Sequence, residues 1–303
     1  MKVSKSVYYL LILSILSIMV VSSFASSLNP ITGKLTSRPV VVNVTIAVPK
    51  ITYISTISAQ TPSESGSISV TLNVTANDNA GTAYIANVTA NFTSGATTRQ
   101  NSSCLDAQNI DANNANFSCT IVLWWFDPSG TYNIGVALND TAGNNATNTS
   151  TTFTYNQLSA FTLAPSALAW NVLTPGALNQ TPTNTPVLLN NTGNKPITSG
   201  NIQINATNLR GETNPNVAIW ANNFSVGTST GSKVECGGTG STNMNWTAYA
   251  AIAGATLPIG NYTVNDGVTG ALKLYPCIKL VGSELTSQAY STANESAWTI
   301  KII

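Results

Sequence analysis

The residues best suited to chemistry in this sequence are asparagines that stand two positions before a serine or threonine. In an exported protein, the side-chain amide of such an Asn-x-Ser/Thr triplet is the acceptor for an N-linked sugar. A chain rich in Asn, Ser and Thr also produces these triplets by chance, so their placement matters more than their number. The weakest, at Asn179, is followed directly by Pro182. The remaining candidates are Asn43, Asn73, Asn87, Asn91, Asn101, Asn116, Asn139, Asn145, Asn148, Asn190, Asn205, Asn223, Asn245, Asn261 and Asn294.

The placement of the triplets follows a period of two. Successive side chains of a β-strand point to opposite faces of its sheet. In the stretch from Ala83 to Thr93, Asn87 and Asn91 therefore share a polar face, opposite Tyr84, Ala86, Val88, Ala90 and Phe92. Asn73 alternates in the same way with apolar neighbours, and Asn139 ends another alternating run. We expect most acceptors on wet faces or in turns, where a sugar has room.

Four cysteines supply a second kind of chemistry. Cys104 and Cys119 lie in the first half of the chain, and Cys236 and Cys277 in the second. Three pairings are open to four cysteines, and only the pairing local to each half keeps the halves independent. On the chain-entropy estimate, the shorter loop would contribute ~3 kcal/mol and the longer ~4 kcal/mol. A zinc site is not expected, because there is no Cys-x-x-Cys spacing and no histidine.

Catalytic candidates are few. The absence of histidine excludes Ser-His and Cys-His nucleophiles, and no Gly-Lys phosphate loop occurs. A glycosidase-type carboxylate pair could come from Asp106 with Asp111, or from Asp127 with Asp140. All four stand in turn contexts, which aspartate favours for local backbone hydrogen bonding. Calcium at Asp78, Asp127 and Asp140 is a weaker alternative to ordinary turn residues. We expect no enzyme, no metal and no cofactor.

Three consecutive aromatic residues, Trp124, Trp125 and Phe126, end a predicted strand. Trp125 would continue the layer of Phe117, Cys119, Ile121 and Leu123, whereas Trp124 and Phe126 would share the other face. If that face is open, Trp124 and Phe126 form a possible binding surface for sugar or protein. The alternative, which we favour, is a central strand that is buried on both sides or covered by the neighbouring module.

The overall charge is small. Charged residues are 8% of the chain, and 12 basic against 11 acidic residues leave a net charge of +1. This balance offers no basic field for nucleic acid. Neutral Asn, Thr and Ser must therefore keep the protein soluble, which suits a carbohydrate-covered surface.

The N-terminus predicts export. Lys2 and Lys5 precede a mostly apolar run from Val7 to Val21, and small residues lead to a cleavage position after Ala25. Residues 1–25 are expected to be a signal peptide, and the location extracellular or at the cell surface. The alternative is an uncleaved signal segment, which would be the only membrane contact.

The remaining chain predicts an all-β fold in two modules. After a polar leader over 26–39, residues 40–156 and 157–303 each show short alternating runs between Gly, Pro, Asn and Asp clusters, at the spacing of a β-sandwich. The first module's strands are expected at 40–48, 51–57, 68–76, 83–92, 117–126, 132–138 and 147–155. Those of the second are expected at 201–206, 217–220, 244–251, 261–264, 271–281 and 297–303.

The stretch FSCTIVLWWFDPSGTYNIGVALNDTAGNNATNTSTTFTY, Phe117 to Tyr155, resembles the closing hairpin of immunoglobulin-like and PKD-like surface modules. The shared features are an aromatic strand, a Pro-Gly turn at Asp127–Gly130, and an Asp-x-x-Gly-Asn turn at Asp140–Asn144. Residues 166–197 resemble, more weakly, the opening of an immunoglobulin-like domain, which implies two strands that flank the turn at Thr174–Gly176. The chain lacks the Cys–Trp–Cys arrangement of antibody domains. The resemblance implies two immunoglobulin-like sandwiches of the kind found as spacers and adhesion units on archaeal and bacterial surfaces.

These features together predict a secreted, N-glycosylated structural or adhesion protein of the cell surface. Its expected partners are other surface proteins or glycans. Two alternatives remain open. The run Val40–Val48, VVVNVTIAV, could complete the sheet of a neighbouring subunit and build a pilus-like filament by β-strand addition, although the first strand of its own module is the simpler assignment. A carbohydrate-binding module would use the aromatic face at Trp124.

Overall fold

The computed structural model describes residues 48–229, 236–260 and 270–303 of the 303-residue chain. In these ranges the chain is all-β, and its helical segments are single 3-10 turns at Thr82–Tyr84 and Ala221–Asn223. No helix within the described ranges is long and apolar enough to cross a membrane. The predicted signal peptide (1–25), the polar leader (26–39), Asn43, nearly all of the 40–48 run, Asn261 and the predicted 261–264 strand lie outside the described residues.

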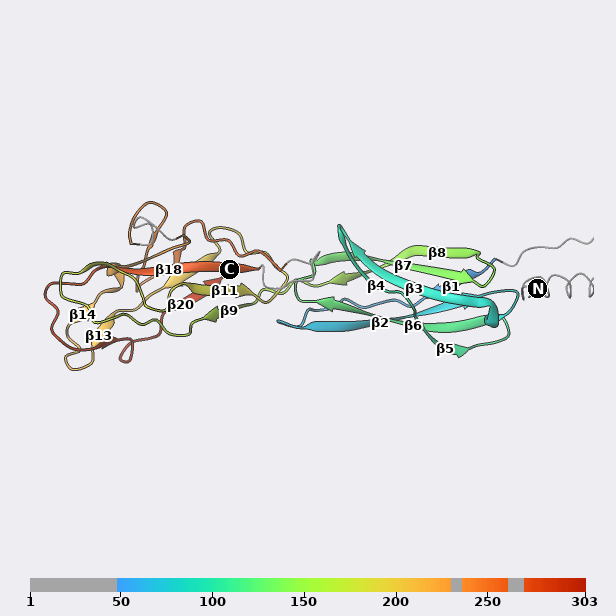
Figure 1. Cartoon of the computed structure of the whole chain (residues 1–303), viewed down its shortest axis with the longest axis horizontal. Coiled ribbons are helices and arrows are strands. Elements are labelled where there is room, and N and C mark those ends of the chain that lie inside the picture. Colours follow the sequence, from blue (N-terminus) through green and yellow to red (C-terminus); the bar gives the residue numbers. More distant parts are fainter. Residues whose placement is uncertain (1–47, 230–235, 261–269) are drawn as a thin grey trace, which may run out of the picture. The chain divides into compact units, whose positions relative to one another are not determined.

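The N-terminal module comprises strands β1 to β8. One sheet has the order β1-β2-β6-β5 and the other β4-β3-β7-β8, and Figure 1 shows them as two layers. All pairs between these strands are antiparallel. The bounds are β1 Lys50–Ile54, β2 Ser67–Asn77, β3 Ile85–Ser94, β4 Thr97–Asn101, β5 Leu105–Asn109, β6 Asn114–Trp124, β7 Gly130–Asp140 and β8 Asn145–Tyr155.

Alternate side chains of the long strands build the core between these two sheets. Strand β2 buries every second residue, and β6 does the same along its whole length. Burial of each such aliphatic or aromatic side chain contributes about 1.5–3 kcal/mol. The buried members include Val70, Leu72, Val74, Val88, Phe92, Phe117, Ile121, Leu123, Tyr132, Ile134, Leu138 and Phe153. The predicted alternation at 68–76, 117–123 and 132–138 is confirmed.

The expectation that Tyr84 and Ala86 lie on the packed face of the strand is wrong for both residues. Tyr84 lies in the 3-10 turn and is 51% exposed, and Ala86 is also exposed. The pairing of β3 with β7 shifts register between Ile85 and Asn87. A bulge of this kind breaks the period of two, so the buried face starts only at Val88.

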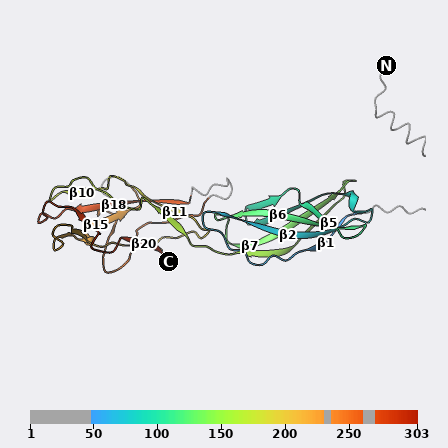
Figure 2. The same ribbon diagram turned by 90° about the horizontal axis from the view of Figure 1, so that it is seen from below.

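The C-terminal module contains a larger sheet of order β16-β15-β18-β11-β9, with β10 also paired to β18. Figure 2 shows β10 and β15 on opposite sides of β18. Two three-stranded sheets, β17-β12-β20 and β14-β13-β19, complete the module. The bounds are β9 Phe161–Ala164, β10 Leu178–Gln180, β11 Val187–Asn191, β12 Ile202–Asn205, β13 Leu209–Gly211, β14 Ala218–Ile219, β15 Phe224–Gly227, β16 Thr242–Asn243, β17 Ala250–Ala251, β18 Ala271–Leu280, β19 Tyr290–Ser291 and β20 Thr299–Ile302.

A second hydrophobic cluster joins these sheets. It combines residues of the larger sheet, such as Leu189 and Phe224, with Ile202 and Ile204 of β12. Trp170 and Trp298 pack against the cluster, and each ring contacts Phe224 edge-on. The two clusters share no residue, so each module has its own core.

The predicted strand at 244–251 is wrong. Asn245 Oδ1 accepts hydrogen bonds from the backbone N–H and the hydroxyl of Thr247, which closes a local turn. Short strands β16 and β17 flank that turn instead of one continuous strand. The expected strand before the turn at Thr174–Gly176 is also absent, since the described chain has no strand between Ala164 and Leu178.

Candidate glycan-acceptor surface

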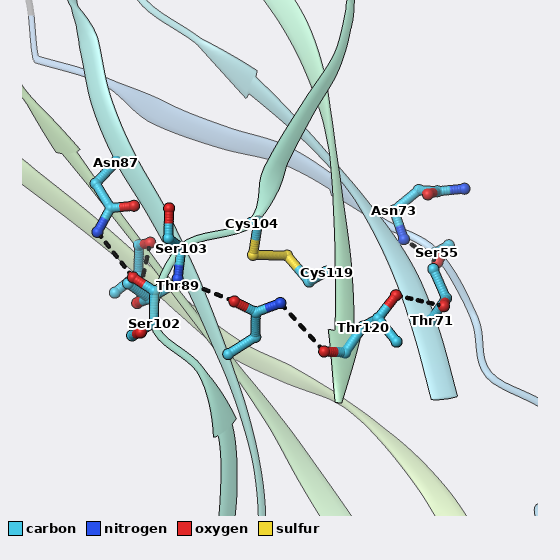
Figure 3. The surroundings of a disulfide bond; sticks show 12 residues. Ser55, Thr71, Asn73, Asn87, Thr89, Ser102, Ser103, Cys104, Cys119 and Thr120 are labelled. Atoms are coloured by element: carbon cyan, nitrogen blue, oxygen red, sulfur yellow. Dashed lines mark hydrogen bonds between the residues drawn. A yellow bond between two sulfur atoms is a disulfide. The ribbon is translucent and has the colours of Figure 1, made fainter. Parts of the chain in front are cut away.

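The outer face of β2 and β6 is a ladder of hydroxyl and amide groups. Thr71 Oγ1 lies 2.8 Å from Thr120 Oγ1, and Thr75 Oγ1 donates to Asn116 Oδ1 at 2.8 Å. Asn73 stands between these rungs, opposite Ser118, and its side chain is exposed. The cross-strand pairs therefore satisfy one another on the sheet surface, while the Asn73 amide faces solvent. Figure 3 shows this face beside the disulfide.

The outer face of β3 and β7 carries Asn87 and Asn91. Asn87 Nδ2 donates to Ser102 O at 3.1 Å, so this side chain lies over the loop after β4 (Figure 3). Asn91 pairs with Gly135, and a Cβ at position 135 would stand 2.5 Å from Asn91 Oδ1. Gly135 thus leaves the space in which the Asn91 side chain lies across β7.

No acceptor asparagine in the described ranges is buried. Those with exposed side chains are Asn73, Asn139, Asn145, Asn179, Asn245 and Asn294. Those with half-buried side chains are Asn87, Asn91, Asn101, Asn116, Asn148, Asn190, Asn205 and Asn223. In the N-terminal module their strand neighbours fill the core, which is the two-sided arrangement that the alternation predicts.

In two acceptors, the N–H and the hydroxyl of the third residue of the triplet both bind the amide oxygen. Asn148 Oδ1 accepts from Ser150 N at 2.9 Å and from Ser150 Oγ at 2.7 Å. Asn245 Oδ1 accepts from Thr247 N at 3.0 Å and from Thr247 Oγ1 at 2.9 Å. In both triplets the hydroxyl residue holds the amide oxygen, so Nδ2 points away from the turn. This leaves the nitrogen that carries an N-linked sugar accessible.

Three amides are committed to backbone carbonyls. Asn87 and Asn101 Nδ2 each donate one hydrogen bond, to Ser102 O and Thr120 O. A sugar-linked amide keeps one N–H, so these bonds are compatible with modification. Asn205 Nδ2 donates to both Asn245 O and Trp246 O, at 3.2 and 3.3 Å. Modification of Asn205 would remove one of these donors, which makes it the poorest acceptor among the three.

The cysteines join within each half of the chain. Cys104 bonds to Cys119 with a Cα–Cα distance of 4.5 Å, and Cys236 bonds to Cys277 with a Cα–Cα distance of 5.2 Å. Cys104 lies between β4 and β5, where the chain crosses from one sheet to the other, and its N–H donates to Val88 O. The first disulfide therefore fixes this crossing to the inner face of β6. Disulfides of this kind are typical of proteins in oxidising compartments.

Asp127 is held in a structural ion pair. Arg99 Nε donates to both of its carboxylate oxygens at 3.0 Å, and Trp124 N donates to Oδ2 at 2.8 Å. The Asp127 side chain is fully buried. Strand β7 separates it from Asp140, which is roughly 34 Å for an eleven-residue strand. A glycosidase pair needs carboxyl groups within about 10 Å, so Asp127 and Asp140 do not form one.

The other turn aspartates accept local hydrogen bonds. Asp140 accepts from Ala142 N, Asn144 N and Asn144 Nδ2, and the Asn144 side chain is the main reason that the pKa of Asp140 is lowered. The Asn114 side chain likewise lowers the pKa of Asp111. Asp78 accepts from Ala80 N. With Asp127 at the far end of β6, the three calcium candidates do not converge, and no group of three metal-binding side chains occurs in the described ranges.

The predicted binding surface at Trp124 and Phe126 is wrong for Phe126. Its side chain is 1% exposed, and its ring stacks on Trp124 at 5.8 Å between centroids. The backbone leaves β6 at Trp124, so strand alternation no longer applies to the next two residues. Trp125 is half-buried rather than part of the core layer. The favoured alternative is also wrong, since Val122 on the outer face is 39% exposed.

Sequence reasoning missed Arg99 and Gly135. Arg99 lies on β4, a strand without apolar alternation, so nothing in the local pattern links it to Asp127. Gly135 sits inside an alternating run and marks a register shift in the β7–β8 pairing between Ile134 and Val136. A glycine within a strand is a signal for a bulge or a close approach.

No family model matches this chain, and no curated protein matches it either.

Proposed function

We propose that this protein is a secreted, N-glycosylated structural or adhesion protein of the cell surface, built from two immunoglobulin-like modules. The observation that carries the proposal is the position of the acceptor asparagines. None in the described ranges is buried, while alternate residues on the same strands fill the core. Sugars could therefore cover both outer faces of the N-terminal module without disturbing its packing.

The mechanism proposed is passive. Each module is held by its own core and its own disulfide. Sugars on the outer faces would hinder proteases and would block random pairing of exposed strand edges. The partners proposed are other surface proteins or glycans, and the attached sugars and the loops would contact them.

Intact-mass analysis of protein from its native source tests this proposal. The expected mass is that of a chain beginning at Ser26 with several hexose-containing additions. Deglycosylation should remove these additions, and reduction of the two disulfides should raise the mass by 4 Da. A chain without added sugar would overturn the proposal. Retention of residues 1–25 would leave the glycan coat in place and assign the membrane contact to the uncleaved signal segment.

A further inference from the structure

The C-terminal module contains an open apolar slot of about 790 Å³. Its walls come from the larger sheet, including Leu274 and Ile278 of β18, and from Ile204 of β12 and Ile300 of β20. Protein cores contain few voids larger than a water molecule. A space of this size between the sheets is therefore a place for an additional group.

The slot lies along free strand edges. Its lining includes Leu163 of β9, Ile300 of β20 and Trp298, which directly precedes β20. Among the described strands, β20 pairs only with β12, and β19 only with β13. These edge strands therefore offer unpaired backbone N–H and C=O groups beside the slot. Such an edge is a template for one more strand.

The segment between β9 and β10 covers the slot incompletely. Residues 165–175 line it without any strand pairing. Trp170 is tethered through Nε1 to Gln180 O at 3.1 Å, but Val172 is fully exposed at the rim. None of the described residues that line the slot is charged. An occupant should therefore be an uncharged chain with apolar side chains on one face.

The chain contains one segment with these properties outside the described strands. In Val40–Val48 the alternate residues Val40, Val42, Val44, Ile46 and Val48 are all apolar and β-branched, and the segment has no charge. The acceptor Asn43 and Thr45 fall on the opposite face. Nine residues span about 30 Å when extended. Pro49 follows directly and has no N–H to extend the ladder into β1.

The connectivity favours a second copy as the donor. Lys50 pairs with Asn77 at one end of the N-terminal module, whereas Tyr155, from which the chain continues to β9, pairs with Gly130 at the other end. Val48 therefore lies near the end of the N-terminal module that is opposite the end from which the chain leaves toward β9. Reaching its own slot would require the segment to return along a module about 34 Å long, the length of the eleven-residue β2.

We infer that Val40–Val48 of one copy inserts as an extra strand beside β20 and fills the apolar slot of the next copy. Main-chain hydrogen bonds to the strand edge would supply affinity, and the five β-branched side chains would supply specificity. The contact is head-to-tail, a type that builds a ring where the rotation between subunits closes and an open filament where it does not. The sugar on Asn43 would face outward from the joint.

Paired variants of the full exported chain test the inference by light scattering after size exclusion. Ile46→Asp places a charge on the inserted face, and Ala47→Asp places the same charge on the opposite face. Ala297→Arg places a charge in the exposed lining of the slot, and Ala293→Arg does so on the neighbouring exposed loop outside it. Circular dichroism checks that all four remain folded.

The expected result is concentration-dependent oligomers for the unmodified protein, for Ala47→Asp and for Ala293→Arg, and monomers for Ile46→Asp and Ala297→Arg. Mixing the two monomeric variants restores one functional slot and one functional strand, so a single heterodimer is expected. A mixture that stays monomeric overturns the inference, as does an Ile46→Asp protein that still forms oligomers. Unfolding of Ile46→Asp would make the segment a strand of its own module and would also overturn it.

Discussion

Arg99 on β4 and Asp127 in the turn after β6 form a buried ion pair, in which the guanidinium Nε lies 3.0 Å from both carboxylate oxygens. Arg99 also stands 5.9 Å from the centre of the Phe126 ring. Strands β4 and β6 belong to different sheets of the N-terminal module. The pair therefore links the two layers where the aromatic residues close the core.

Replacement of Arg99 by Leu is expected to destabilise the protein by about 3 kcal/mol, because it leaves the Asp127 carboxylate buried without its charged partner. Urea unfolding followed by tryptophan fluorescence measures the change. Glu295→Gln is the matched control, since Arg210 and Glu295 form a more exposed pair. It should change stability by less than about 1 kcal/mol. Equal losses in both variants would contradict the structural role of Asp127.

Gly135→Ala is expected to destabilise the N-terminal module by about 1 kcal/mol, because the new Cβ would meet Asn91 Oδ1 at 2.5 Å and the Asn91 side chain would have to move. Removal of that obstacle in the double variant Asn91→Ala/Gly135→Ala should recover most of the loss. Unglycosylated protein from a bacterial host separates this packing effect from any change in sugar content. Additive losses in the double variant would show that the two residues do not interact.

Acid should weaken the protein through Asp140. Hydrogen bonds from Asn144 hold its pKa below the ordinary value of 3.8, so the ionised group contributes stability above that value and loses it as pH falls through the lowered pKa. Asp140→Asn should therefore be less stable at neutral pH and should show a flatter decline below about pH 4. Thermal unfolding between pH 2 and pH 7 measures both. If Asp140→Asn leaves the pH profile of stability unchanged, Asp140 does not make this contribution. Glu212→Gln, at an exposed carboxylate, is the control and should leave the profile unchanged.

The disulfides should contribute separately. Loss of Cys104–Cys119, with a separation of 15 residues, is expected to destabilise its module by about 3 kcal/mol, and loss of Cys236–Cys277, with a separation of 41, by about 4 kcal/mol. Paired Cys→Ala variants of each bridge, unfolded in urea, test this. If each module keeps its own core, each variant should lower one unfolding transition and leave the other unchanged.

The long strands of the N-terminal module could be predicted because their burial is periodic. Leu72, Val74, Ile121 and Leu123 are buried at every second position, and the residues between them, Asn73 and Val122, are exposed. Strand β4 could not be predicted, since Thr97 is its only buried residue, and β5 begins with Leu105, which is 75% exposed. These two strands form by pairing with β3 and β6, which is a tertiary effect that the local sequence does not encode.

In the C-terminal module, most strands have five residues or fewer, so periodicity carries little information. Strand β18 is the exception, with ten residues, and it was predicted at 271–281. The acceptor positions could be read from the triplets, but the hydrogen bonds that their side-chain amides make could not. Asn205 and Asn245 carry equivalent triplets, yet Asn205 Nδ2 is bound to two carbonyls while Asn245 is exposed. That difference arises from contacts between distant segments.

Glycopeptide mapping of protein from its native source tests the central claim most directly. The predicted result is sugar on exposed acceptors, above all Asn73, Asn139, Asn145, Asn245 and Asn294, with Asn205 occupied least. Intact, unmodified peptides at every one of these exposed positions would contradict the account.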